Sequence, residues 1–136
     1  MLPAEVFLSH ASPDREVADR LAQTLRRHNL PVWYSPTDIV GAQQWHDEIG
    51  AALDRCDWFA VLLTRASVES MWVKRELMFA LQQTRYESHI VPILIEPCDF
   101  RRLSWVLSSL QMIDLRLGFE EGCRQLLRLW GVGYRP

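Results

Sequence analysis

The chain has 136 residues, the length of one ordinary domain, so a second independent core is not expected. Its composition is 49% hydrophobic and 24% charged, which excludes a disordered or collagen-like chain. The formal net charge of -2 provides no basic excess for binding phosphate backbones, so a direct role on nucleic acid is disfavoured.

No part of the sequence reads as a targeting or membrane-spanning segment. The N-terminal residues, Met1 to Glu5, lack the basic and apolar regions of a signal peptide, and no apolar run approaches about 20 residues. We therefore expect a soluble, cytoplasmic protein that does not contact a membrane. Cys56, Cys98 and Cys123 are odd in number and widely spaced, which argues against disulfides and structural zinc and favours small buried thiols.

Five apolar runs predict the strands of a parallel sheet. Most are continuous rather than alternating, which is typical of strands that are covered by helices on both faces. The runs are Ala4 to Ser9, Leu30 to Tyr34, Trp58 to Thr64, Ile90 to Ile95 and Leu110 to Leu115.

Helical patterns lie between these runs. Ser12 and Pro13 supply a predicted N-cap and first residue for the first helix, and Asn29 suits its end. Later helices are predicted over Gln44 to Arg55, Met71 to Tyr86, Arg102 to Ser109 and Phe119 to Trp130, the last ending at Gly131. Strands that alternate with helices imply right-handed crossovers and a doubly wound α/β fold.

The longest connection without a clear helical pattern runs from Ser35 to Gln43. It follows the second strand and therefore lies at the carboxyl edge of the sheet, where open α/β folds bind ligands. We interpret it as a functional loop, with an ordinary surface loop as the alternative.

Several common types of site are missing from the sequence. The first turn, from Ser9 to Asp14, contains no glycine, so neither a dinucleotide fingerprint nor a P-loop is present. Ser9 and His10 are neighbours at a strand end, where adjacent side chains point to opposite faces, so they do not easily share a proton. No histidine pair has the spacing of a helical metal site, and we predict no metal.

The helix that begins at Met71 carries the most informative side chain. Its predicted inward arc is Val73, Leu77, Ala80, Leu81 and Thr84, and its solvent arc is Lys74, Arg75, Gln82 and Arg85. Glu76 belongs to neither arc and projects between Trp72 and Phe79 at the border of the core. A carboxylate there loses hydration unless a partner or ligand compensates it. The alternatives are a functional site and a salt bridge to Arg15, Arg55 or another base.

A carboxylate beside an indole face suits the cleavage of an N-glycosidic bond. That reaction builds positive charge on the ribose, which a fixed carboxylate stabilises, while an aromatic face can hold a departing cationic base. Nicotinamide in NAD already carries a positive charge and leaves neutral, so it needs no general acid. Glu76 and Trp72 are therefore compatible with NAD cleavage.

Three segments, in order, resemble the TIR (Toll/interleukin-1 receptor) domain family, particularly its bacterial NAD-cleaving members. Glu5 to Asp14 is similar to the family's opening strand and loop. Val32 to Tyr34, with Gly41, Trp45 and Ile49 after it, is similar to the second strand, the loop and the helix beyond. Val61 to Thr64 and Ser70 to Leu77 resemble the third strand and the Ser-x-Trp-x-x-x-Glu-Leu signature, and Val91 to Ile93 the fourth strand.

The resemblance implies a single TIR domain over residues 1–136. It implies a flavodoxin-like, doubly wound, five-stranded parallel sheet of order 2-1-3-4-5 with helices on both faces. It also implies cleavage of NAD+ to nicotinamide and ADP-ribose or a cyclic variant, with NAD+ as substrate and no cofactor. The alternative is a non-catalytic adaptor module that acts by TIR to TIR association in signal transduction.

The resemblance also assigns residues and partners. The family's catalytic glutamate maps onto Glu76, and the residues expected to border the dinucleotide are Ser9, His10, Trp33, Asp38, Gly41, Ser70 and Trp72. Ser35 and Val40 stand where many relatives have an acid and a proline, and Asp38 is a nearby substitute for the acid. The resemblance also implies homotypic assembly through the loop from Ser35 to Gln43 and a role in immune or antiphage-type signalling. It further implies a sensor or oligomerising domain outside this chain.

Overall fold

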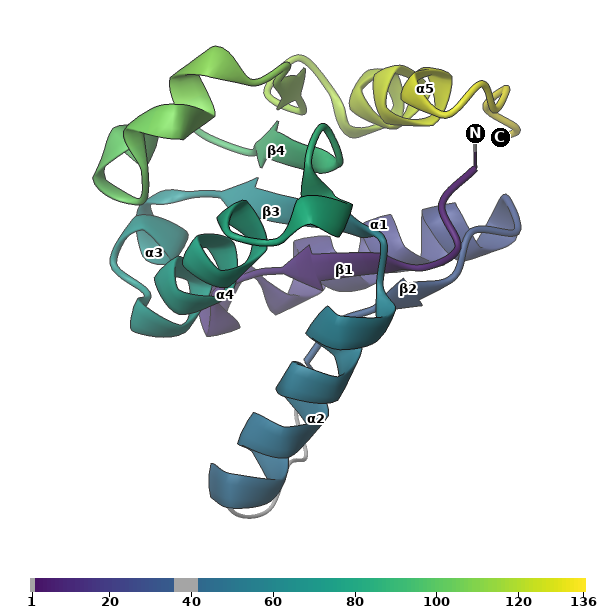
Figure 1. Cartoon of the computed structure of the whole chain (residues 1–136). Helices are drawn as coiled ribbons and strands as arrows, with labels where there is room; N and C mark the ends of the chain where they lie inside the picture. The colour runs from purple at the N-terminus through teal and green to yellow at the C-terminus, as the bar shows by residue number, and fades with distance from the viewer. Residues whose placement is uncertain (1, 36–41) are drawn as a thin grey trace.

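The computed structural model describes residues 2–35 and 42–136, and of residues 42–45 it describes the backbone only. Five strands form one parallel sheet in the order β2-β1-β3-β4-β5 (Figure 1). They are β1 (Val6–Ser9), β2 (Val32–Trp33), β3 (Trp58–Leu63), β4 (Ile90–Leu94) and β5 (Ile113–Asp114). This order confirms the predicted flavodoxin-like α/β fold.

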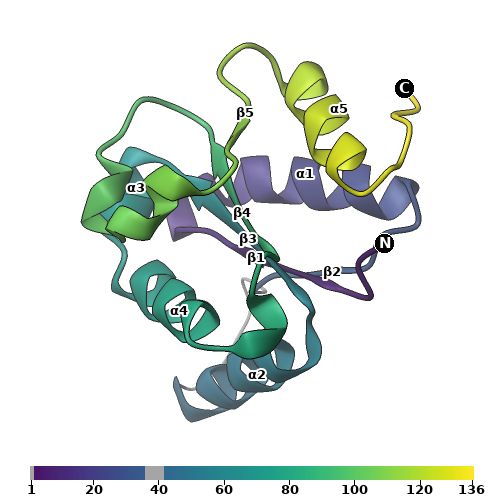
Figure 2. The same cartoon turned by 45° about the horizontal axis from the view of Figure 1, so that its top comes forward.

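Helices cover both faces of the sheet, as predicted. The α-helices are α1 (Arg15–Arg27), α2 (Ala42–Arg55), α3 (Arg65–Val68), α4 (Met71–Leu81) and α5 (Phe119–Leu129). Short 3-10 helices connect them: η1 (Ser12–Asp14), η2 (Thr84–Tyr86), η3 (Phe100–Arg102) and η4 (Trp105–Ser109). Figure 2 shows α1 and α5 on one side of the strands and α2 and α4 on the other.

Side chains of β1 divide between two cores. Val6 and Leu8 pack into the core under α1 and α5, whereas Phe7 belongs to the core under α2 and α4. Because successive side chains of a strand point to opposite faces, Ser9 follows Phe7 toward α4. The last residue of this central strand is therefore aimed at the helix that carries Glu76.

The first helix begins later than predicted. Ser12 starts the 3-10 helix η1, and α1 begins at Arg15, so Ser12 is not its N-cap. The Asp14 carboxylate accepts a hydrogen bond of 2.6 Å from the Thr64 hydroxyl at the end of β3, a tertiary contact that holds the tighter turn. At the other end Asn29 has a φ of 64°, which confirms that the helix stops there.

The predicted helix from Met71 to Tyr86 is too long. It ends at Leu81, and Tyr86 on η2 turns back into the core, where its hydroxyl donates to the Leu53 carbonyl at 2.6 Å. This buried contact overrides the local helical pattern, and it leaves Thr84 exposed rather than inward. The short helix α3, whose start is capped by Thr64 and Ser67, was not predicted.

The edges of the sheet are also shorter than predicted. β2 and β5 are the two edge strands, and each has two residues rather than the five or six of its apolar run. Within the described ranges, no helix is long and apolar enough to cross a bilayer. The cysteines are free, with Cys56 and Cys123 buried as expected and Cys98 half-buried.

Two helical glycines make a matched test of this packing. A Cβ at Gly122 of α5 would lie 2.6 Å from Cγ and 3.2 Å from Cα of Leu115, whereas a Cβ at Gly50 of α2 meets nothing within 4 Å. Both alanine substitutions gain the same helix propensity. In urea unfolding we expect Gly50→Ala to stabilise by about 0.5–1 kcal/mol and Gly122→Ala to destabilise by about 1–3 kcal/mol. Stabilisation by both would contradict the close contact between α5 and the end of β5.

Candidate active site

The helix α4 places Glu76 at the border of a core. Ser70 is the N-cap residue, and its hydroxyl accepts a 3.2 Å hydrogen bond from the Val73 amide. From this start Val73, Leu77 and Ala80 are buried against the sheet at helical spacing, as predicted. Glu76 lies beside this stripe and is only 8% exposed.

The carboxyl group of Glu76 meets the end of the central strand. The Ser9 hydroxyl donates a buried hydrogen bond of 2.7 Å to Oε1 of Glu76, which joins residues 67 positions apart in the sequence. Burial raises the pKa of Glu76 from its ordinary value of 4.5 to about 7, and the hydrogen bond from Ser9 opposes that rise. Desolvation dominates because one hydroxyl donor replaces only part of the lost hydration.

The alternative of a salt bridge between Glu76 and an arginine is not found among the described residues. Arg15 pairs with Asp19 at 3.1 Å, and Arg55 pairs with Glu5 at 2.7 Å. Among residues 2–35 and 42–136, apart from the side chains of 42–45, no cation pairs with the Glu76 carboxylate. The charge of this group is therefore uncompensated, which favours the functional interpretation over a structural ion pair.

A pocket of about 470 Å³ opens beside Glu76 between α2 and α4. Trp72, Glu76 and Phe79 line it from α4, together with Arg75, whose guanidinium lies 5.4 Å from the Trp72 ring. The pocket therefore combines an acidic group with two aromatic side chains, as the spacing along the helix predicts. This volume is within the range of small-molecule sites.

The opposite wall of the pocket was missed by sequence reasoning. It is formed by the α2 residues His46, Ile49, Gly50, Leu53 and Asp54. The His46 ring lies 6.5 Å from the ring of Trp72. The signal was present, because His46, Gly50 and Leu53 recur at helical spacing and so share one side of α2.

The remaining predicted residues lie in several places. His10 points away from Ser9, with Nδ1 2.9 Å from the Ala11 carbonyl and its ring against Tyr34, and burial lowers its pKa. Trp33 packs on Phe7, with ring centroids 5.2 Å apart, and does not line the Glu76 pocket. The predictions for Asp38 and Gly41 fall outside the described residues. Ser9, Glu76 and Trp72 are thus brought together.

The start of the loop after β2 is held by α1. The Arg15 guanidinium donates to the Ser35 carbonyl and lies 4.6 Å from the ring of Tyr34. The Tyr34 hydroxyl donates to Asp19 at 2.7 Å, and Asp19 also pairs with Arg15. This cluster fixes the point at which the chain leaves the sheet edge.

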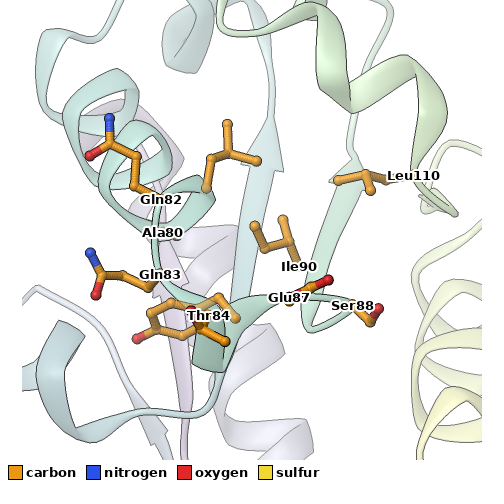
Figure 3. A pocket seen from close by; sticks show the side chains of 10 residues that line it. Ala80, Gln82, Gln83, Thr84, Glu87, Ser88, Ile90 and Leu110 are labelled. Atoms are coloured by element: carbon orange, nitrogen blue, oxygen red, sulfur yellow. The ribbon is translucent and has the colours of Figure 1, made fainter.

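A second pocket, of about 310 Å³, lies at the other end of α4 (Figure 3). The side chains around it are mainly amides, hydroxyls and aliphatic groups, including Gln82, Gln83, Thr84, Ile90 and Leu110. The carboxylate in its lining comes from Glu87, which is exposed. A buried acid is therefore a feature of the Glu76 pocket, and that pocket is the stronger candidate for chemistry.

The sequence matches a known protein family. The family model described as TIR domain matches residues 6–127, which is most of the chain. The chain belongs to the TIR domain family. The match confirms the resemblance carried by the segments around Ser9, Trp33 and Glu76. It covers the family as a whole and does not separate its NAD-cleaving members from its adaptors.

Solved TIR domains have the same fold. The TIR domain of the Toll-related receptor TRR-2 from Hydra magnipapillata is 20% identical, with a TM-score of 0.67 over 91% of this chain and 88% of that one. The TIR domains of the activated Roq1 resistosome, which directly recognises the pathogen effector XopQ, are 16% identical, with a TM-score of 0.72 over 93% and 98%. Among curated proteins, no sequence matches this TIR domain.

The environment of Glu76 predicts a pH-dependent loss of stability in this TIR domain. Below about pH 4.5 the carboxyl is protonated in the folded and unfolded chains alike. Between about pH 4.5 and 7 the carboxyl ionises in the unfolded chain but stays protonated in its desolvated position in the folded chain. We expect the free energy of unfolding to fall by about 3 kcal/mol over this pH range relative to Glu76→Gln. Urea unfolding at several pH values measures the difference.

Glu16→Gln is the matched control for this measurement, because Glu16 is exposed on α1. Its difference from the wild type is expected to show no such fall between pH about 4.5 and 7. A constant difference between wild type and Glu76→Gln over the same range would contradict the desolvated position of the carboxyl.

Proposed function

We propose that this TIR domain is an NAD+ glycohydrolase that cleaves the bond between nicotinamide and ribose. The observation that carries the proposal is a buried carboxyl group that pairs with no cation among the described residues. It accepts a hydrogen bond from Ser9 and lies in a pocket beside Trp72. The family includes NAD-cleaving enzymes and non-catalytic adaptors. The position of Glu76 favours the enzyme, because an adaptor has no use for an uncompensated buried acid.

The proposed role of Glu76 is electrostatic. As the N-glycosidic bond breaks, its electron pair leaves with nicotinamide, which becomes neutral, and positive charge develops on the ribose. An ionised Glu76 beside the ribose stabilises that charge in a site with little competing hydration. Attack by water gives ADP-ribose, and attack by an atom of the same molecule gives a cyclic product.

The aromatic and polar residues around Glu76 are proposed to bind NAD+. The Trp72 ring provides a face for the cationic nicotinamide. The Ser9 hydroxyl keeps the Glu76 carboxyl in place through its 2.7 Å hydrogen bond. The other proposed binding residues are His10, Trp33, Asp38, Gly41 and Ser70.

Removing the charge of Glu76 tests the proposal directly. We expect Glu76→Gln to lower the rate of NAD+ cleavage by about 10²–10³ or more, since the amide cannot neutralise positive charge on the ribose. The measurement is release of nicotinamide by purified, concentrated protein. Wild-type kcat/KM is expected to rise as the pH passes through about 7, where Glu76 ionises.

Glu87→Gln is a matched control, because it removes an exposed carboxylate that follows η2 and does not line the Glu76 pocket. It is expected to keep wild-type activity. Equal turnover of NAD+ by wild type and Glu76→Gln would overturn the assignment.

We also propose that assembly activates the enzyme. The proposed contact is homotypic and uses the loop from Ser35 to Gln43, whose first residue is held by Arg15. Cytoplasmic immune or antiphage-type signalling, driven by a sensor or oligomerising domain outside this chain, is the proposed setting. The alternative is an adaptor that signals through the same contact without cleaving NAD+.

Assembly predicts a particular dependence on concentration. Specific activity is expected to rise with protein concentration, because an isolated copy offers only part of the site. Nicotinamide release, measured while the protein is diluted about a hundredfold, tests this dependence. Specific activity that stays constant would contradict activation by assembly. The adaptor alternative makes a different prediction for cells. Under it, Glu76→Gln would preserve the cellular phenotype, whereas substitutions in the loop would abolish both self-association and the phenotype.

A further inference from the structure

Gly50 lies in the interior of α2, where a glycine needs an explanation. Glycine destabilises a helix relative to alanine, so a helical glycine usually has a packing or a functional reason. Gly122 of α5 has a packing reason, because a side chain there would collide with Leu115. A Cβ at Gly50 would meet no atom within 4 Å. Packing of the described residues therefore does not account for Gly50.

The open space beside Gly50 belongs to the candidate active-site pocket. Gly50 lines this pocket of about 470 Å³ together with Ile49 and Leu53 of the same helix and Glu76 of α4. Ile49 and Leu53 are buried, whereas Gly50 is half-buried. Because a Cβ at position 50 meets no atom, a longer side chain there would extend into the open volume of the pocket.

Contacts at the two ends of the pocket show how α2 and α4 lie against each other. Toward the start of both helices, the ring of His46 lies 6.5 Å from the ring of Trp72. Toward the end of α2, the Leu53 carbonyl accepts a hydrogen bond of 2.6 Å from Tyr86, which follows α4 in the chain. Both helices cover the same face of the sheet (Figure 2), and these contacts show that they run in the same direction.

Gly50 and Glu76 lie at the same level of the two helices. Gly50 follows His46 by four residues, and Glu76 follows Trp72 by four residues. Four residues of helix advance by about 6 Å and return to nearly the same side. The pair therefore lies one turn further along the pocket than the two rings, so Gly50 faces Glu76 across it. The missing side chain leaves space in front of the carboxyl group.

We propose that Gly50 is a specificity-determining residue, which keeps the space in front of Glu76 open for the ribosyl group of NAD+. This inference rests on the proposed function, because a carboxylate stabilises charge on the ribose only at close range. Gly50 contributes no chemical group to the reaction. Its contribution is volume, and the helix gives up stability at this position to provide it.

Larger side chains at position 50 are expected to exclude NAD+ without disturbing the fold. Gly50→Leu places a branched aliphatic side chain in the pocket, and binding of NAD+ is expected to weaken about tenfold or more. Gly50→Ala adds only a Cβ and is expected to weaken binding by less than about threefold. Both substitutions raise helix propensity, so the free energy of unfolding is expected to rise. Substitution of a residue with a structural role would lower it.

The experiment measures binding and stability where the substrate is not consumed. Calorimetric titration of concentrated protein with NAD+ compares Glu76→Gln, as the parent, with the double variants that add Gly50→Leu or Gly50→Ala to it. Urea unfolding of the same chains measures their stability. Release of nicotinamide is measured separately on chains that retain Glu76, where Gly50→Leu is expected to raise KM for NAD+.

Ala51→Leu, added to the same parent, is the matched control. Ala51 is the next residue of α2, it is exposed, and it does not line the pocket. The substitution places the same leucine side chain on the same helix but outside the pocket. Its binding of NAD+ is expected to equal that of the parent.

The role of Gly50 would be contradicted by a parent that binds no NAD+, or by binding that Gly50→Leu leaves unchanged. Equal weakening by Ala51→Leu, or a Gly50→Leu chain less stable than the parent, would contradict it as well. The enzymatic proposal fails separately. If NAD+ binding depended on position 50 as expected but the wild type released no nicotinamide, only the proposed cleavage would be wrong.

Discussion

Alternation of side chains along β1 is the constraint on which the rest of the structure depends. β1 is an inner strand of the sheet, hydrogen-bonded to β2 on one side and to β3 on the other, and its four residues are buried. Val6 and Leu8 complete one core, while Phe7 completes the other. The same alternation aims Ser9 at α4, while the ring of His10 lies against Tyr34. A shift of one residue in this strand would exchange the two sets and remove the partner of Glu76.

Glu76 is a group that folding tolerates rather than one that stabilises the fold. Its neighbours Val73, Leu77 and Ala80 already anchor α4, so the helix does not need a carboxyl group to pack. The Ser9 hydroxyl satisfies one oxygen without supplying charge. A site of this kind leaves the acid ready to respond to a cation that arrives from solution, whereas a pre-formed salt bridge would compete with it.

The sequence predicts features that repeat along the chain better than features that depend on distant partners. The existence of the strands follows from apolar runs, the strand order from the family resemblance, and the position of Glu76 from helical spacing together with the family signature. The end of α4 does not, because it depends on Tyr86 reaching the Leu53 carbonyl. The partner of Glu76 was also unpredictable from helical spacing, since Arg15 and Arg55 are taken by Asp19 and Glu5. Such competition is visible only when the elements are assembled.

The two-residue edge strands have a consequence for how copies of the chain meet. An exposed strand edge offers unpaired amide and carbonyl groups as a template for another chain, and long flat edges favour aggregation. Val32–Trp33 and Ile113–Asp114 offer little such template. Joining two sheets edge to edge would therefore yield few backbone hydrogen bonds. Any contact between copies would therefore depend on side chains, which substitution can change without disrupting the sheet.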